Sequence, residues 1–149
     1  MSTLYLFARI AGTAVAVRTD EIEAVVRLKD VSPVPGVPPH VVGLSALRSR
    51  VLTVVDAATL VLGPASGPPI WPDSGRYAIM CEVGGHSYGL LVEGVDDIAA
   101  IAAPPLPLCG RVDRAWEPHA QDVVENAGRS HFVLSVSRLL EQCGSAQPA

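Results

Sequence analysis

Short apolar segments alternate with turns that contain glycine or proline along most of this chain, and this alternation is typical of many short β-strands. Residues 4–10 and 14–17 flank a glycine-containing turn and predict a β-hairpin. Residues 77–83 and 87–92 flank a second glycine turn and predict another hairpin. An acidic segment follows each hairpin, so the order of elements repeats. We therefore expect two related small β-barrels.

The first hairpin is followed by a capping pattern that predicts a short helix. Asp20 is expected to cap this helix, and Glu23 completes a capping box. The helix must be short because residues 25–28 have the composition of a strand. Residues 32–39 then hold four prolines, which exclude a helix or a central strand and predict a rigid, extended loop.

Two strands and a helix are expected before the middle of the chain. Residues 41–48 predict a strand that leads into a turn, and residues 51–55 are apolar and β-branched and predict a buried strand. Asp56 is expected to cap a helix over residues 57–62, which Gly63 ends.

The next segment, residues 64–75, is rich in Pro, Gly and Ser and predicts a linker. Its Ile70 and Trp71 are expected to pack back against the body of the protein. Beyond the second hairpin, the sequence predicts a strand, an irregular proline-rich stretch, a last strand and a terminal helix capped by Ser137. These elements are expected at residues 98–101, 104–124, 131–136 and from 137 onward, respectively.

The length of 149 residues suits one compact domain or two very small ones. Hydrophobic residues make up 49% of the chain and charged residues 17%, against roughly 25% charged in average soluble domains. Either partners cover part of the surface, or a chain rich in Ala and Val has an ordinary surface. We expect a single domain over residues 1–149, with approximate barrel subdomains at 4–63 and 76–140. The first strand and the C-terminal helix can cross between these subdomains.

Charge and hydropathy narrow the classes of function. The formal net charge is −4 and no basic cluster is present, so no nucleic-acid partner is expected. Residues 1–9 lack the basic and apolar regions of a secretion signal. The most hydrophobic segment, residues 51–62, is interrupted by Asp56 and is too short to span a bilayer. We expect a soluble, cytoplasmic protein without direct membrane insertion, which reaches a membrane only through its partners.

No motif assigns catalytic chemistry. The three cysteines and four histidines are widely spaced, which suggests neither a disulfide framework nor a metal site. Ser45 lies in a partial nucleophile-elbow pattern that lacks its second glycine, and Asp96 and Asp97 are interpreted as solvated turn carboxylates. We assign no catalytic, cofactor-binding or metal-ligating residue and expect no cofactor. An enzyme with an unrecognised site around His86 or His119 remains an alternative.

Arg48 closes an apolar strand and is followed closely by Arg50. An arginine at a strand end, beside a loop ordered by prolines, can pair with a carboxylate of a partner or of its own fold. The alternative is an ordinary exposed arginine. Arg48 is therefore a candidate for a binding role.

An ordered series of motifs resembles the CheW-like family of chemotaxis coupling proteins. The segment Val-Gly-Leu-Ser-Ala-Leu-Arg at residues 42–48 is similar to the family's Gly-Val-x-Asn-Leu-Arg-Gly signature. Residues 31–38 resemble its proline-rich approach, residues 51–56 its Val-x-Pro-Val-x-Asp strand and residues 89–95 its Gly-Leu-x-Val-Asp-x-Val hairpin. Residues 132–140 resemble its closing strand and helix. The series extends over nearly the whole chain.

The resemblance implies a mainly β fold of two small five-stranded SH3-like β-barrels packed side by side, with short helices. It also implies a non-catalytic scaffold that couples the cytoplasmic tip of methyl-accepting chemoreceptors to the regulatory domain of a CheA-type histidine kinase. The receptor's helical hairpin would lie in an apolar groove between the barrels, and the kinase domain would make barrel-to-barrel contacts. The residues expected at the receptor groove or the kinase contact are Ile22, Val25, Leu47, Arg48, Tyr77 and Ile98.

Several polar positions depart from the family pattern. Ala46 replaces the Asn of the signature, Ser49 its final Gly, Glu93 the Asp of the second hairpin and Ser135 the Asp of the last strand. The Glu common after the first short helix falls at Ala24. Apolar core positions are kept, which predicts the same fold with divergent partners. A CheW-like adaptor that links receptors or other regulators without binding a kinase is therefore a second hypothesis.

Overall fold

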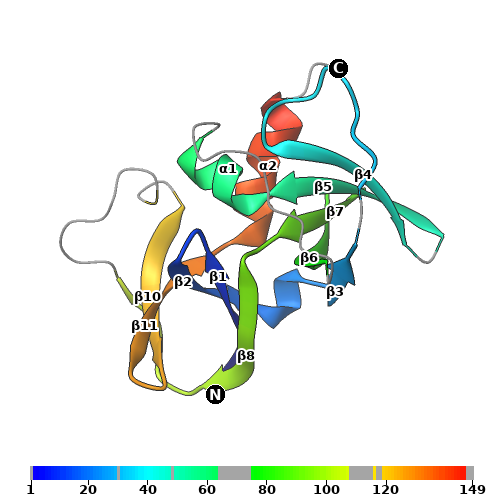
Figure 1. Cartoon of the computed structure of the whole chain (residues 1–149). Helices are drawn as coiled ribbons and strands as arrows, with labels where there is room; N and C mark the ends of the chain where they lie inside the picture. The colour runs from blue at the N-terminus through cyan, green and yellow to red at the C-terminus, as the bar shows by residue number, and fades with distance from the viewer. Residues whose placement is uncertain are drawn as a thin grey trace.

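Two sheets of six and five strands form the computed structural model, which describes residues 2–29, 31–47, 49–63, 75–107, 116 and 119–146 (Figure 1). The strands are β1 (Thr3–Ile10), β2 (Thr13–Arg18), β3 (Ala24–Leu28), β4 (Val41–Leu47), β5 (Arg50–Asp56), β6 (Arg76–Val83), β7 (His86–Leu91), β8 (Gly94–Ile101), β9 (Leu106–Pro107), β10 (Ala120–Asn126) and β11 (Arg129–Leu134). The helices are the 3₁₀ helix η1 (Thr19–Glu21) and the α-helices α1 (Ala57–Leu62) and α2 (Val136–Ala146). The expected mainly β fold of two small barrels with short helices is confirmed.

The two sheets repeat one arrangement of strands. In the first sheet, the hairpin β1–β2 pairs with β8 on one side and, in parallel, with β11 on the other, and β10 extends from β11 to the short β9. In the second sheet, the hairpin β6–β7 pairs in the same way with β3 and with the parallel β5, which is followed by β4. The register of both outer hairpins shifts at an equivalent place, between Ala120 and Asp122 and between Val41 and Gly43. The repeated order of elements in the sequence thus corresponds to a repeated topology.

The chain exchanges hairpins between the sheets. After β2 it passes through η1 into β3 of the second sheet, and after β7 it passes through Val92 and Glu93 into β8 of the first. Both β1 and β2, rather than the first strand alone, therefore lie with β8 to β11. Helix α2 also crosses, because it contacts β6. The sheets consequently do not follow the expected subdomains 4–63 and 76–140.

Strand β1 is buried on both faces, which shows how the sheets share a core. Tyr5 and Phe7 point into a cluster inside the first sheet, whereas Leu6, Ala8 and Ile10 join a larger cluster with residues of β5, β6, β7 and α2. A third cluster lies within the second sheet and consists of Leu28, Val54, Ala78 and Leu91. The largest cluster, called the central core below, packs the two sheets against each other.

The capping box predicted at Asp20 is wrong. The helix there is only the three residues of η1, whose N-cap residue is Arg18 and which has no side-chain capping hydrogen bond. Asp20 instead lies 2.6 Å from the guanidinium of Arg18, and Glu23 pairs with Arg50. The helix cannot lengthen because β3 begins at Ala24 and is already paired with β6.

The stretch at residues 104–124 is not irregular throughout, since it contains β9 and most of β10. Strand β10 forms a hairpin with β11 through Ala127 and Gly128, which both have positive φ angles. Polar residues interrupt the apolar pattern of β10, so the sequence does not indicate a strand. The prediction that Asp96 and Asp97 lie in a turn is also wrong: they are exposed residues of β8, which is paired with β1.

The bounds predicted for α1 are confirmed, although Asp56 acts differently. Asp56 precedes the helix and Gly63 follows the helix. The Asp56 carboxylate, however, makes no capping hydrogen bond to the backbone. It accepts a hydrogen bond from the Thr59 hydroxyl at 2.6 Å and lies 3.6 Å from the guanidinium of Arg76. This buried carboxylate therefore joins α1 to the start of β6.

Two further expectations differ in detail. Helix α2 begins at Val136, and the hydroxyl of Ser135, rather than that of Ser137, accepts the hydrogen bond from the Arg138 N–H. Leu52, Val54 and Val55 of β5 are buried as predicted, whereas Thr53 is half-buried and Val51 is 62% exposed. The predicted linker lies outside the described residues up to residue 74, and so do Ile70 and Trp71.

Candidate protein-binding surface

Ile98 lies on the face of β8 that continues the central core. In the β1–β8 ladder it is opposite Leu6, which is fully buried in that core. Leu4 lies two residues before Leu6 on the same face of β1. Leu4 is 46% exposed and Ile98 is 55% exposed. Alternation along two paired strands therefore places apolar side chains where the central core meets solvent.

Val25 and Tyr77 extend this apolar surface from the second sheet. Both are half-buried and pack against the central core. In the β3–β6 ladder Val25 is opposite Ile79 and Arg27 is opposite Tyr77, so these four side chains share one face. The Arg27 guanidinium lies over the Tyr77 ring, 4.5 Å from its centroid, and donates a hydrogen bond to the Tyr77 hydroxyl at 2.6 Å.

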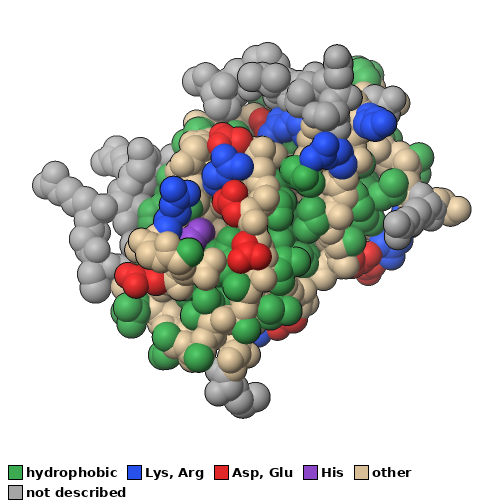
Figure 2. Space-filling model, turned by 60° about the horizontal axis from the view of Figure 1, so that its bottom comes forward, with side chains coloured by type: hydrophobic (Ala, Val, Ile, Leu, Met, Phe, Trp, Pro, Cys, Tyr) green, Lys and Arg blue, Asp and Glu red, His purple; other side chains and the backbone are tan. Residues whose placement is uncertain are grey.

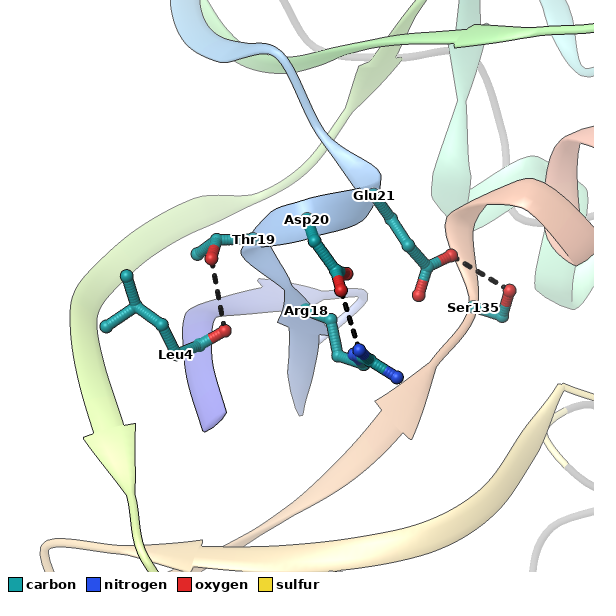
Figure 3. A network of polar contacts seen from close by, with 6 residues as sticks. All are labelled: Leu4, Arg18, Thr19, Asp20, Glu21 and Ser135. Carbon is teal, nitrogen blue, oxygen red and sulfur yellow. Dashed lines mark hydrogen bonds and ion pairs between the residues drawn. The ribbon is translucent and has the colours of Figure 1, made fainter. Parts of the chain in front are cut away.

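Ile22 is contributed by the crossover between the sheets. It is half-buried against the central core, and its backbone N–H donates to the Thr19 carbonyl at 3.3 Å. The Thr19 hydroxyl donates to the carbonyl of Leu4, also at 3.3 Å, which brings the crossover against β1 (Figure 3). Ile22 therefore lies in the crossover that leads from β2, beside β1, to β3.

We call Leu4, Ile22, Val25, Tyr77 and Ile98 the apolar strip. Figure 2 shows hydrophobic side chains gathered across the middle of the face that contains β8 and the crossover, with charged groups to either side. Of the six residues predicted for binding, Ile22, Val25 and Tyr77 pack against the central core and Ile98 lies opposite its Leu6, and their role in binding stays a prediction. Leu4 was not predicted, although its period-two spacing from Leu6 in an expected strand is a signal that it shares the face of a core residue.

Leu47 lies at the end of β4 and not in the central core. It is paired with Arg50 across the β4–β5 hairpin, and Arg50 lies 2.5 Å from Glu23 and 4.0 Å from Glu82. Because Glu23 follows Ile22 in the crossover, this ion pair holds the tip of the hairpin beside the apolar strip. Arg48 lies outside the described residues, so its predicted role stays a prediction.

The two histidines of the enzyme alternative differ in burial. His86 is exposed at the start of β7, and His119 is half-buried, with burial lowering its pKa from the ordinary value of 6.5. In the described parts of the chain, no three His, Cys, Asp or Glu side chains lie close enough to hold a metal ion. Within the same residues, no helix has the length and apolar character needed to cross a membrane.

Comparisons with known proteins agree with this fold. The model of the CheW family, described as a CheW-like domain, matches residues 4–143. The crystal structure of the scaffolding protein TtCheW from Thermoanaerobacter tengcongensis is similar, with a TM-score of 0.74 over 95% of this chain and 94% of that chain. The sequences are 18% identical, so this likeness concerns the fold alone. A comparison with curated proteins gave no match.

Proposed function

The chain belongs to the CheW-like domain family, and we propose from this premise that it is a non-catalytic scaffold of a chemosensory array. In this role it couples the cytoplasmic tip of chemoreceptors to the regulatory domain of a CheA-type histidine kinase. It acts in the cytoplasm and is recruited to the membrane through the receptor. The family match over nearly the whole chain supports this proposal.

The apolar strip is the observation that carries the receptor contact. Its side chains continue the central core to the surface, and Ile98 and Leu4 remain about half-exposed there. A receptor tip is an antiparallel helical hairpin, and an amphipathic helix binds such a surface by laying its apolar stripe along it. Burying Ile98 and Leu4 under a helix removes apolar area from water, which favours the complex.

The kinase contact involves the other exposed apolar side chains of the second sheet. Val51 is opposite Ala46 in the β4–β5 ladder, and Leu44 lies two residues away on the same face. Leu44 is 39% exposed and Val51 is 62% exposed. This face suits a barrel-to-barrel contact with a kinase domain of the same fold. Arg48, which follows Leu47 in the sequence, is proposed to fix the geometry of one of the two contacts.

The scaffold passes the signal without chemistry of its own. A receptor that binds the scaffold–kinase complex more tightly in one kinase state shifts the population of kinase towards that state. The size of the shift is limited by the difference in affinity between the two states. The scaffold therefore needs both contacts at once, on separate surfaces.

Calorimetry with purified partners tests this function. The probes are the cytoplasmic-tip fragments of the chemoreceptors and the regulatory domain of the histidine kinase from the same genome. We expect both to bind the full chain and to bind it together. Receptor binding without kinase binding would instead identify an adaptor that links receptors only. Binding of neither partner would contradict the proposed function.

A further inference from the structure

Arg27 occupies a defined place at the edge of the apolar strip. It is exposed, lies on the same face of β3 as Val25 and is opposite Tyr77 in the ladder. Its guanidinium is held twice by Tyr77, through the ring face and through the hydroxyl. Such a contact restricts the rotamers of a long side chain and leaves other N–H donors free to bind a ligand. The strip therefore has a fixed cation beside it.

The charge of Arg27 is not paired with a carboxylate, in contrast to that of four other arginines of the described residues. The guanidiniums of Arg9, Arg18, Arg50 and Arg76 each lie within 4.0 Å of a carboxylate. Among the described residues, Arg27 has no carboxylate within that distance, and its recorded partner is the uncharged hydroxyl of Tyr77. Asp96, on β8 of the other sheet, is already paired with Arg9 at 3.2 Å. Within the described residues, no carboxylate therefore pairs with the cation at the strip.

We propose that Arg27 determines partner specificity by selecting a helix with a carboxylate about one turn from its apolar stripe, the spacing at which helical side chains are neighbours. The proposal rests on the receptor contact proposed above and adds the chemistry of its ligand. Arg27 forms a charge-assisted hydrogen bond with an Asp or Glu of that helix, and its planar fork favours carboxylate over uncharged acceptors. A helix with Lys or Arg at that place is rejected by like charge.

Titration calorimetry of full-length variants with the cytoplasmic-tip fragments of all chemoreceptors from the same genome tests this. Arg27→Gln should weaken binding about threefold and Arg27→Glu about tenfold or more, because the reversal adds repulsion to the lost bond. Raising the salt concentration should weaken the binding of the receptor tip by the wild type, and it should weaken binding by Arg27→Gln to a smaller extent. Single Asp/Glu→Arg changes near the apolar stripe of the bound fragment should include one that restores binding to Arg27→Glu.

Arg129→Glu is the matched control, because it makes the same change of net charge at an exposed arginine of β11, away from the strip. It should leave receptor affinity within about twofold of wild type. If Arg27→Glu and Arg129→Glu weaken binding equally, Arg27 has no specific role, although the receptor contact stands. If wild type binds none of the fragments, the proposed function and this inference both fail. Thermal unfolding of each variant shows whether the fold is retained.

Discussion

The carboxylate of Glu21 lies at the start of helix α2, where its Oε1 accepts a hydrogen bond from the Ser135 hydroxyl at 3.0 Å (Figure 3). The same oxygen accepts from the backbone N–H of Ser137 at 3.4 Å. The Ser135 hydroxyl in turn accepts from the Arg138 N–H at 3.3 Å. A negative charge is favourable at a helix N-terminus. In this chain Ser135 stands at the position of the Asp in the family pattern, and Glu21 supplies a carboxylate at the same place.

Removing the charge of Glu21 should destabilise the protein through α2. We expect Glu21→Gln to lower the free energy of unfolding by about 1 kcal/mol, the usual size of a capping interaction. Urea denaturation followed by circular dichroism measures this. Asp20→Asn, one residue earlier, breaks only the exposed pair with Arg18 and should cost less than about 0.5 kcal/mol. An equal loss for both variants would show that the contact with α2 contributes nothing.

The ion pair between Glu23 and Arg50 should contribute to stability and to the position of the β4–β5 hairpin. Both side chains are more than one third exposed, so solvent screens the pair, and a double-mutant cycle of Glu23→Gln and Arg50→Gln should give a coupling of about 0.3–1 kcal/mol. The coupling should shrink in high salt. Hydrogen exchange at Val51 should quicken in either variant. A coupling of zero, or one that salt leaves unchanged, would contradict this role.

The sequence predicts the two hairpins, the proline-rich loop and the bounds of α1 because their signals are local: glycine turns, proline and strong apolar runs. It misses β10, whose polar residues hide a strand that only tertiary pairing stabilises. The exchange of hairpins between the sheets is also not predicted, because no local sequence signal distinguishes pairing of β3 with β2 from pairing of β3 with β6. Ile22, Val25, Tyr77 and Ile98 were placed on one surface by the family resemblance, whereas Leu4 and Arg27 needed the observed register.

Gly43 should tolerate no side chain. A Cβ at this position would lie 2.2 Å from the Ser32 carbonyl oxygen, across the bridge that joins Ser32 to Leu44. The Ser32 backbone and the Val31 side chain leave little room to relax, so Gly43→Ala should lower the free energy of unfolding by about 2–4 kcal/mol, as overpacked and strained positions do. The matched variant Gly84→Ala meets no atom within 4 Å. Its positive φ of 60° should cost only about 1 kcal/mol. Chemical denaturation compares the two, and equal losses would refute the steric explanation.

His131 should make stability depend on pH. It is buried in the first sheet, with its ring centroid 4.6 Å from that of Phe7. Burial lowers its pKa from the ordinary 6.5, and the nearby Arg129 acts in the same direction, whereas the Arg129 carbonyl and Asp96 oppose the shift. The unfolded chain therefore binds the proton more readily. The contribution of neutral His131 to the free energy of unfolding is fully present above pH 6.5. This contribution is lost as the pH falls below 6.5 towards the pKa of His131 in the folded state.

The thermal midpoint of unfolding should consequently decrease when the pH is lowered from about 7 to about 5. His131→Phe should make this decrease smaller because the ring is kept without a titrating group. Part of the dependence should remain, since burial also lowers the pKa of His40 and His119. An unaltered profile in His131→Phe would show that this histidine does not report on folding.

The separation of receptor and kinase contacts can be tested with two side chains of similar exposure. Ile98 is 55% and Val51 is 62% exposed, on different sheets. Because neither is buried, Ile98→Ser and Val51→Ser should each change the free energy of unfolding by less than about 1 kcal/mol. If the apolar strip binds the receptor, Ile98→Ser should weaken receptor-tip binding about tenfold, as loss of a buried anchor does, and leave kinase affinity unchanged. Val51→Ser should do the reverse. Calorimetry with each partner measures these affinities. If Ile98→Ser binds the receptor tip with normal affinity, the apolar strip is not part of the receptor contact. If Val51→Ser binds the kinase with normal affinity, the face of β4–β5 that contains Val51 is not part of the kinase contact.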